Sequence, residues 1–218
     1  MTAREKTRPL DNQHCFRGAG LVYWGARASG LQPSRETRPV RDGHKFDFVR
    51  DHDSFPMNNG GIEFPRNEPL SRRKLIRFFP LSGSVQTAMT GNWWLDIDAL
   101  SVMMSWAQNA DMPLSKAVGT LLAVPLKWGD CRRFVVATPK VNLRAYFGKG
   151  KRVALTAGGQ DISPDAARKP GTMVYGPPPG TNLEHIFIPG EPDLLARCMT
   201  KDADHAIAQD GSIEPPIY

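Results

Sequence analysis

Three short runs of β-branched and aromatic residues, far apart in the chain, constrain the fold most strongly. They read KLIRFF (74–79), CRRFVVAT (131–138) and LEHIFIPG (183–190), and each predicts a β-strand. Between the first two, the segment 91–110 starts with an aromatic pair and then predicts a core-facing helix from about Asp96, and residues 113–124 predict a second, short apolar helix. Because strands come early and late with helices in the middle, and no repeat is visible, we predict an α+β fold rather than a regular β-α-β succession.

The chain has 218 residues, enough for one fairly large domain with extended arms. We predict a flexible N-terminal arm over 1–12, a single domain that would carry any chemistry over 13–199, and a polar tail over 200–218. Residues 35–73 are rich in Arg, Asp, Asn, Gly and Pro and show little periodicity. This composition predicts a long loop or lid.

The net charge of +6 is unevenly distributed along the chain. Residues 131–175 are strongly basic, whereas residues 176–218 are acidic. A basic body with an acidic end suits a phosphate-bearing ligand, a nucleic acid, or simply solubility. Charge alone leaves these three interpretations open.

The three cysteines, Cys15, Cys131 and Cys198, are widely spaced and form no pattern typical of a zinc site. We therefore predict reduced thiols and no bound metal. The N-terminus lacks an apolar signal segment, and no run approaches the ~18 apolar residues of a membrane span. The sequence thus predicts neither a Sec signal nor a spanning helix, and leaves a signal-free secretion route open.

Three segments carry side chains that could act together on one ligand. Arg17, followed by Gly18, offers a guanidinium fork for phosphate oxygens. Trp93 and Trp94 could form a wall for a flat heteroaromatic ring. Glu184, at the start of the last predicted strand, could stabilise an oxocarbenium-like centre and activate a nucleophile. This combination would hold NAD⁺ and break its nicotinamide–ribose bond.

Each of these residues also has an ordinary structural interpretation. Arg17 would be a surface ion-pair partner, the Trp93–Trp94 pair would plug the core, and Glu184 would be an edge charge on a strand. The functional interpretation depends on all three occurring together.

The segments resemble, in order, the motifs of ADP-ribosyltransferase toxins. CFRGAG…YWGARASGLQPS (15–34) resembles the first motif, in which an aromatic-Arg-small strand precedes a helix and a Gly-Leu-x-Pro turn. GNWWLDIDALSVMMSWA (91–107) resembles the middle motif of related families, and RRFVVATPKVNLRAYFG (132–148) is similar to a strand of cholera- and pertussis-like toxins. NLEHIFIPGEPDLL (182–195) resembles the last motif, where the catalytic Glu opens a strand.

The resemblance implies a fold, an activity and a setting. The fold would be a split two-sheet sandwich of ADP-ribosyltransferase type with helices at one side. The activity would be mono-ADP-ribosyl transfer, or hydrolysis, with NAD as co-substrate and an unknown macromolecular acceptor. The setting would be a bacterial effector or toxin, made in the cytoplasm without a Sec signal and then secreted or injected, with an immunity protein or chaperone as partner.

The resemblance also implies roles for single residues. Glu184 would be the catalytic glutamate, with Arg17 beside it. The residues that would contact NAD are Arg17, Gly18, Trp93, Trp94 and Asn182.

Two positions depart from the family pattern. Leu95 stands where the family often has a hydroxyl residue. Asn182 stands two residues before Glu184, where arginine-modifying toxins have Glu and pertussis-like toxins have Gln. The second departure leaves the acceptor open and argues against a standard arginine modifier.

Basic blocks with interleaved aromatic residues support an alternative of a different class. Phe78 and Phe79 follow several Arg and Lys residues, and Tyr146 and Phe147 lie within the basic 131–175 segment. Aromatic rings beside cations are typical of surfaces that stack nucleic acid bases. The alternative is a basic nucleic-acid-binding protein, or a phage or mobile-element assembly protein, without catalysis.

Overall fold

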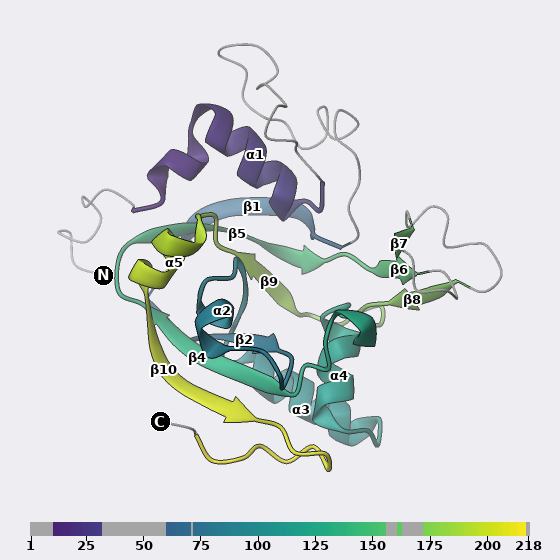
Figure 1. Ribbon diagram of the computed structural model, residues 1–218. Helices are drawn as coiled ribbons and strands as arrows, with labels where there is room; N and C mark the ends of the chain where they lie inside the picture. The colour runs from purple at the N-terminus through teal and green to yellow at the C-terminus, as the bar shows by residue number, and fades with distance from the viewer. Residues whose placement is uncertain (1–10, 32–59, 71, 156–160, 163–171, 217–218) are drawn as a thin grey trace.

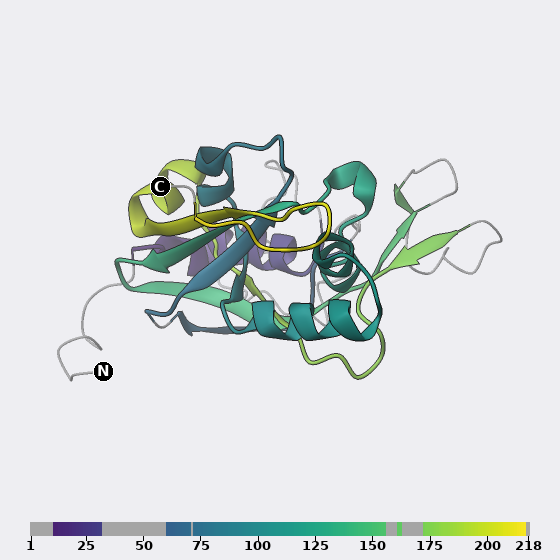
Figure 2. The same cartoon turned by 90° about the horizontal axis from the view of Figure 1, so that it is seen from below.

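The computed structural model describes residues 11–31, 60–70, 72–155, 161–162 and 172–216. Within these residues, a large antiparallel sheet has helices against both of its faces, and a small sheet extends to one side (Figure 1). Seen from below, the small sheet projects away from the body of the domain (Figure 2). The predicted α+β class is confirmed.

The large sheet has seven strands in the order β1-β5-β9-β3-β2-β4-β10, and the small sheet has the order β7-β6-β8. The bounds are β1 Ile62–Leu70, β2 Leu75–Phe79, β3 Trp93–Asp96, β4 Arg133–Pro139, β5 Leu143–Gly150, β6 Val153–Leu155, β7 Asp161–Ile162, β8 Met173–Tyr175, β9 Glu184–Phe187 and β10 Met199–Ala206. The helices are η1 Gln13–Phe16, α1 Gly18–Ala28, α2 Val85–Met89, α3 Ala99–Asn109, α4 Leu114–Leu121, η3 Leu126–Trp128 and α5 Pro192–Cys198.

One face of the large sheet packs against α2 and α5, and we call it the α2–α5 face. Side chains from nearly every strand meet the two short helices in one apolar cluster. The sheet residues that define this face are Leu70, Leu75, Phe79, Trp94, Val135, Ala137, Leu143, Ala145, Phe147, Ile186 and Met199. This cluster is the largest of the described core.

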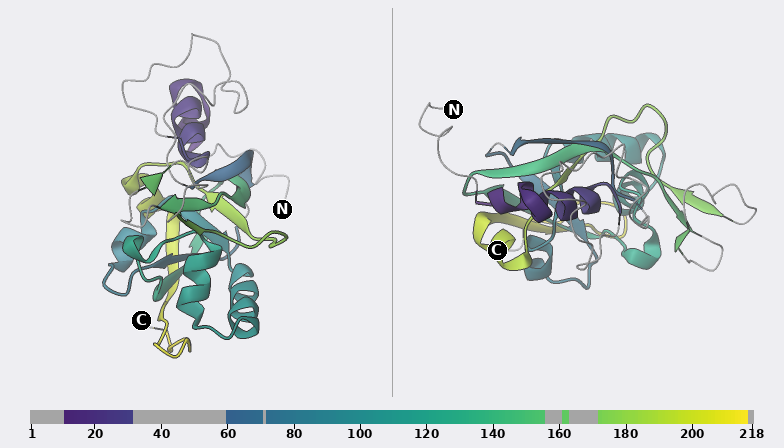
Figure 3. Two further views of the ribbon diagram at one scale, coloured as in Figure 1. Left: turned by 90° about the vertical axis from the view of Figure 1, so that its right-hand side faces the viewer. Right: turned by 90° about the horizontal axis from the view of Figure 1, so that it is seen from above.

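The other face is covered in two parts. Helix α1 lies over the half formed by β1, β5 and β9, where Trp24 meets Ile62, Tyr146 and Phe187 (Figure 3). We call this half the α1 face. Helices α3 and α4 cover the remaining half, around Ile76 of β2, Leu95 of β3 and Phe134 of β4. Both faces of the sheet therefore carry helices.

Several predicted elements are confirmed with sharper bounds. The strands at 74–79 and 131–138, the helix at 113–124 and the strand that begins at Glu184 are all present as β2, β4, α4 and β9. The segment 91–110 contains a short strand, β3, before its helix, because the Trp pair continues the sheet. Residues 143–150, for which the sequence left strand or turn open, form β5.

Two predictions about the periphery are wrong. The predicted polar tail begins inside β10, which pairs along its whole length with β4. The predicted loop over 35–73 contains β1, which pairs with β5. Both are edge strands of the sheet, so neither shows the apolar pattern of a buried strand. Residues 32–59, the rest of the predicted lid, lie outside the described residues.

The end of the predicted N-terminal arm is packed against the sheet. Asn12 is fully buried, and its side chain donates to the carbonyls of Arg144 (2.8 Å) and Pro189 (3.0 Å) and accepts from the Arg144 N–H (3.0 Å). These bonds join the approach to α1 to β5 and to the turn after β9. Residues 1–10 of the arm lie outside the described residues.

Candidate functional site

Glu184 opens β9, a central strand between β5 and β3. Its side chain is 43% exposed and pairs with Arg66 of β1, with Nη2 of Arg66 2.5 Å from Oε1. The same guanidinium donates through Nε to Glu68 at 3.0 Å. These hydrogen bonds raise the pKa of Arg66 above its ordinary value, and the bond to Glu184 has the largest effect. Glu184 is thus an accessible carboxylate held by a cation from a strand that the sequence did not predict.

The register of β9 decides which face Glu184 occupies. Successive side chains of a strand point to opposite faces, so Glu184 and Ile186 share one. Ile186 pairs with Trp94 and Phe147, and all three belong to the α2–α5 face. Phe187 points the other way, toward α1. Glu184 therefore lies on the α2–α5 face.

The two tryptophans of β3 point to opposite faces. Trp94 is only 2% exposed, lies in the α2–α5 face and donates its Nε1–H to the Gly91 carbonyl at 2.7 Å. Trp93 is half-buried on the α1 face, with its ring 4.7 Å from that of Phe187. The pair does not form a common wall, and Trp94 is a core residue.

Arg17 does not lie at a strand end. It is the N-cap residue of α1, with extended backbone angles, an exposed side chain and no side-chain capping bond. Gly18 follows with φ +50°, and a side chain there would meet nothing within 4 Å. Since α1 packs on Phe187 through Trp24, at a ring separation of 6.2 Å, Arg17 belongs to the layer over the α1 face. The structure does not bring Arg17 to the face that carries Glu184.

A different arginine, Arg77, is on the same face as Glu184. It lies between Leu75 and Phe79 of β2, and both of these neighbours belong to the α2–α5 face. Its Nη1 donates to the Trp93 carbonyl at 3.0 Å. Strand β3 separates β2 from β9, so Arg77 and Glu184 stand on one face with a single strand between them.

Arg77 is a half-buried cation without an acidic partner among the described residues. Its Nε is buried and makes no hydrogen bond there, and burial lowers the pKa of the guanidinium to about 10. The guanidinium lies directly against Gly91, where a Cβ would approach its Cζ to 1.9 Å. A buried guanidinium nitrogen without a hydrogen-bond partner carries a desolvation cost, which a nearby anion would offset.

A second ion pair on the same side of the sheet joins Arg73, just before β2, to Asp96 at the end of β3. Nη1 of Arg73 is 2.7 Å from Oδ2 of Asp96. The Cζ of Arg73 lies 5.5 Å from the ring centre of Phe147. Asp96 is two residues after Trp94, and Glu184 is two residues before Ile186. Because β3 and β9 are antiparallel, Asp96 and Glu184 lie toward the same end of the two strands. The α2–α5 face thus gathers charged side chains of both signs beyond its apolar cluster.

His185, next to the candidate carboxylate, is on the opposite side of β9. Its Nε2 is buried without a hydrogen-bond partner among the described residues, and burial lowers the pKa of His185 to about 4. The ring fills the space above Gly150, where a Cβ would lie 2.6 Å from Nε2. His185 is therefore neutral at pH 7 and faces away from Glu184.

Asn182 is exposed in the segment that leads into β9, two residues before Glu184. Among the hydrogen bonds of the described residues, none involves its side chain. Its position leaves it able to meet a ligand that reaches Glu184.

The cysteines are unpaired and buried. Burial, with a smaller effect from Glu191, raises the pKa of Cys15 to about 12, which makes its thiol a poor nucleophile. In the ranges that the structure describes, no group of three or more His, Cys, Asp or Glu side chains could hold a metal ion.

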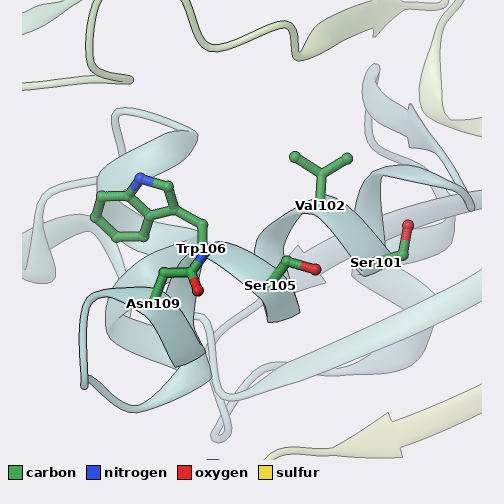
Figure 4. A pocket seen from close by; sticks show the side chains of 5 residues that line it. All are labelled: Ser101, Val102, Ser105, Trp106 and Asn109. Atoms are coloured by element: carbon green, nitrogen blue, oxygen red, sulfur yellow. The ribbon is translucent and has the colours of Figure 1, made fainter.

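A shallow hollow of about 360 Å³ lies elsewhere, along one side of α3 (Figure 4). The residues that line it are Ser101, Val102, Ser105, Trp106 and Asn109. It carries no ionisable side chain and therefore offers no general acid or base.

None of the helices in the described part of the chain has the length and apolar character needed to span a bilayer. No protein-family model, no curated protein and no solved structure matches this chain.

Proposed function

We propose that the protein cleaves the nicotinamide–ribose bond of NAD⁺, as a mono-ADP-ribosyltransferase or an NAD glycohydrolase. One observation carries the proposal. Arg77, a half-buried guanidinium whose Nε is buried and which has no acidic partner in the described residues, shares a face of the sheet with the accessible carboxylate of Glu184. A cation for the diphosphate and a carboxylate for the ribosyl centre are the two charges that this substrate requires.

The separation of the two side chains suits NAD⁺. Adjacent strands lie ~4.8 Å apart and each residue advances ~3.4 Å along a strand. Two strand spacings and two residues place the Cα atoms of Arg77 and Glu184 roughly 12 Å apart on this geometry. The diphosphate and the nicotinamide ribose of one NAD⁺ molecule can bridge such a distance.

The proposal gives Arg77 the role that the sequence motif assigned to Arg17. Arg77 lies on a strand, as the first motif of the family implies for its arginine, whereas Arg17 lies at the start of α1. Trp94 supports the strand from the core rather than offering its ring to the nicotinamide. Asn182, exposed near Glu184, remains a candidate contact for the substrate or the acceptor.

The chemistry follows from the two charges. The C1′–N bond of NAD⁺ breaks and its electron pair leaves with nicotinamide, which becomes neutral. Glu184 stabilises the resulting ribosyl cation, and Arg77 holds the diphosphate. A nucleophile then bonds to C1′ and loses its proton to Glu184. With water as nucleophile the product is ADP-ribose, and with a macromolecular acceptor it is the ADP-ribosylated acceptor.

The aromatic residues do not support the alternative of nucleic-acid binding. Phe79, Tyr146 and Phe147 are buried in the core, and Phe78 is half-buried against it. Rings in these positions cannot stack on bases. The resemblance to toxins and effectors therefore remains the stronger guide to function, with a bacterial effector secreted or injected without a Sec signal as the accompanying proposal.

The test is nicotinamide release from NAD⁺ by the purified protein, followed by chromatography. We expect turnover by the wild type and a loss of at least 100-fold in Glu184→Gln, which keeps the shape of the side chain but not its charge. Thermal melting of both proteins controls for folding. Absence of turnover in the wild type, with no thermal shift on addition of NAD⁺, would refute the proposal.

A further inference from the structure

The partner of Glu184 is Arg66, 118 residues away in sequence. Arg66 lies on the edge strand β1, and its Nη2 contacts only one carboxylate oxygen, Oε1. No hydrogen bond within the described residues reaches the second oxygen, Oε2. Glu184 therefore presents one occupied and one available oxygen.

A bulge in β1 presents Arg66 to β9. The register with β5 shifts between Glu63 and Arg66, so that Glu63 pairs with Lys149 and Arg66 pairs with Phe147. Phe64, inside the bulge, has φ +44°, a backbone conformation that is unfavourable for a bulky residue. An extra residue in one strand commonly re-aims a side chain beside a functional site. The backbone thus places the Arg66 guanidinium on the side of Glu184.

Two cations lie next to Glu184, while the nearby carboxylates Glu68 and Asp96 are each paired with an arginine. Lys149 pairs directly with Glu184 in the β5–β9 register and is exposed. Arg66 holds Oε1, and Asn182, two residues before Glu184, adds no negative charge. With Oε1 occupied, a second guanidinium could not form the bidentate fork with both carboxylate oxygens, and it would approach two cations. A nucleophile with a single O–H donor needs only Oε2.

We propose that Arg66 determines the acceptor: it excludes guanidinium side chains and admits a hydroxyl nucleophile, water or an alcohol. This inference rests on the proposed NAD⁺ cleavage. In the step concerned, the C1′–N bond breaks, its electron pair leaves with nicotinamide, the hydroxyl oxygen bonds to C1′, and the hydroxyl proton passes to Oε2 of Glu184. Solvent then removes this proton.

The experiment measures how the ADP-ribosyl group is partitioned among competing acceptors. NAD⁺ is incubated with the protein in the presence of agmatine, a free guanidine, or methanol, a simple alcohol. Mass spectrometry quantifies ADP-ribose, ADP-ribosyl-agmatine and methyl ADP-ribose. Nicotinamide release is followed in the same tubes.

We expect the wild type to form ADP-ribose and methyl ADP-ribose but no agmatine adduct. Arg66→Gln should form the agmatine adduct at a level at least tenfold above the detection limit, because it removes the positive charge from Oε1. Arg66→Lys should restore rejection, a result that a merely structural role would not produce. Arg72→Gln is the matched control, because Arg72 is exposed and bonds only to the Lys140 carbonyl among the described residues.

Each outcome decides between the two proposals. If the wild type forms the agmatine adduct, or if Arg66→Gln forms no more of it than the wild type, the role of Arg66 is refuted while NAD⁺ cleavage stands. If the wild type releases no nicotinamide, the proposed function fails and this inference fails with it. Exposed ion pairs contribute little to folding, and thermal melting verifies that Arg66→Gln is folded.

Discussion

Arg77 on β2 and Glu184 on β9 face the same side of the large sheet, with only strand β3 between them. The two residues are more than a hundred positions apart in the chain. Arg77 has a carbonyl as its hydrogen-bond partner and Glu184 has Arg66. Among the described residues, the face therefore contains a half-buried cation that lacks a counter-charge and, one strand away, a carboxylate that is accessible to solvent.

The unpaired charge of Arg77 predicts a conflict between stability and function. A buried cation without a partner costs free energy, and an apolar side chain of similar length removes that cost. We expect Arg77→Met to raise the free energy of unfolding by about 1 kcal/mol, which corresponds to a rise of about 2–4 °C in melting temperature. The same variant should lose its thermal response to NAD⁺. A lower melting temperature would identify Arg77 as a structural residue.

Gly91 predicts a second way to disturb the same site. A Cβ at this position would lie 1.9 Å from the Arg77 Cζ, and the flexible end of the arginine can move away. We expect Gly91→Ala to keep its melting temperature within a few degrees but to raise KM for NAD⁺ at least tenfold. Gly119→Ala, in α4, is the control and should leave KM unchanged. Equal KM values in the two variants would show that Gly91 plays no part in NAD⁺ binding.

Arg133 and Asp204 provide the contrasting case of an arginine that serves the fold. Nε and Nη2 of Arg133 meet the two oxygens of the buried Asp204 at 2.9 and 2.6 Å, joining β4 to β10. Arg133→Met would leave the carboxylate buried and unpaired, so we expect a loss of about 3 kcal/mol in the free energy of unfolding. Urea denaturation measures it. A loss below about 0.5 kcal/mol in the free energy of unfolding would mean that solvent already screens the pair.

His185 predicts how stability depends on pH. Its pKa is about 4 in the folded protein against 6.5 ordinarily, so the unfolded chain binds more protons between these values. The contribution of His185 to stability is therefore complete above pH 6.5 and is lost as pH falls toward 4. We expect His185→Gln to flatten the fall in melting temperature over this window. An unchanged slope in the variant would assign the acid sensitivity to other groups.

The sequence predicted the α+β class and most of the interior elements because buried strands and helices carry periodic apolar patterns. It missed β1 and β10, whose segments IEFPRNEPL and MTKDADHA are polar because one edge of each strand is not paired within the sheet. Pro65 and Pro69 in β1 are compatible with an edge strand but not with a central one. Edge strands are therefore recognisable only after their neighbours are known.

The candidate site was predicted in part. Glu184 could be selected from its position at the start of a strand, but the choice of arginine depended on a local motif around Arg17. The signal for Arg77 was present as a charged residue inside the apolar run LIRFF. Neither the pairing of β2 with β3 nor the contact of Arg66 with Glu184 can be inferred from local patterns, because both depend on long-range strand order.

The central claim, that NAD⁺ binds on the face shared by Arg77 and Glu184, is tested most directly by comparing two arginine variants. Initial rates of nicotinamide release are measured over a range of NAD⁺ concentrations for Arg77→Gln and Arg17→Gln. The account predicts at least a tenfold fall in kcat/KM for Arg77→Gln and wild-type kinetics for Arg17→Gln. The reverse result, a defect in Arg17→Gln with normal kinetics in Arg77→Gln, would contradict it.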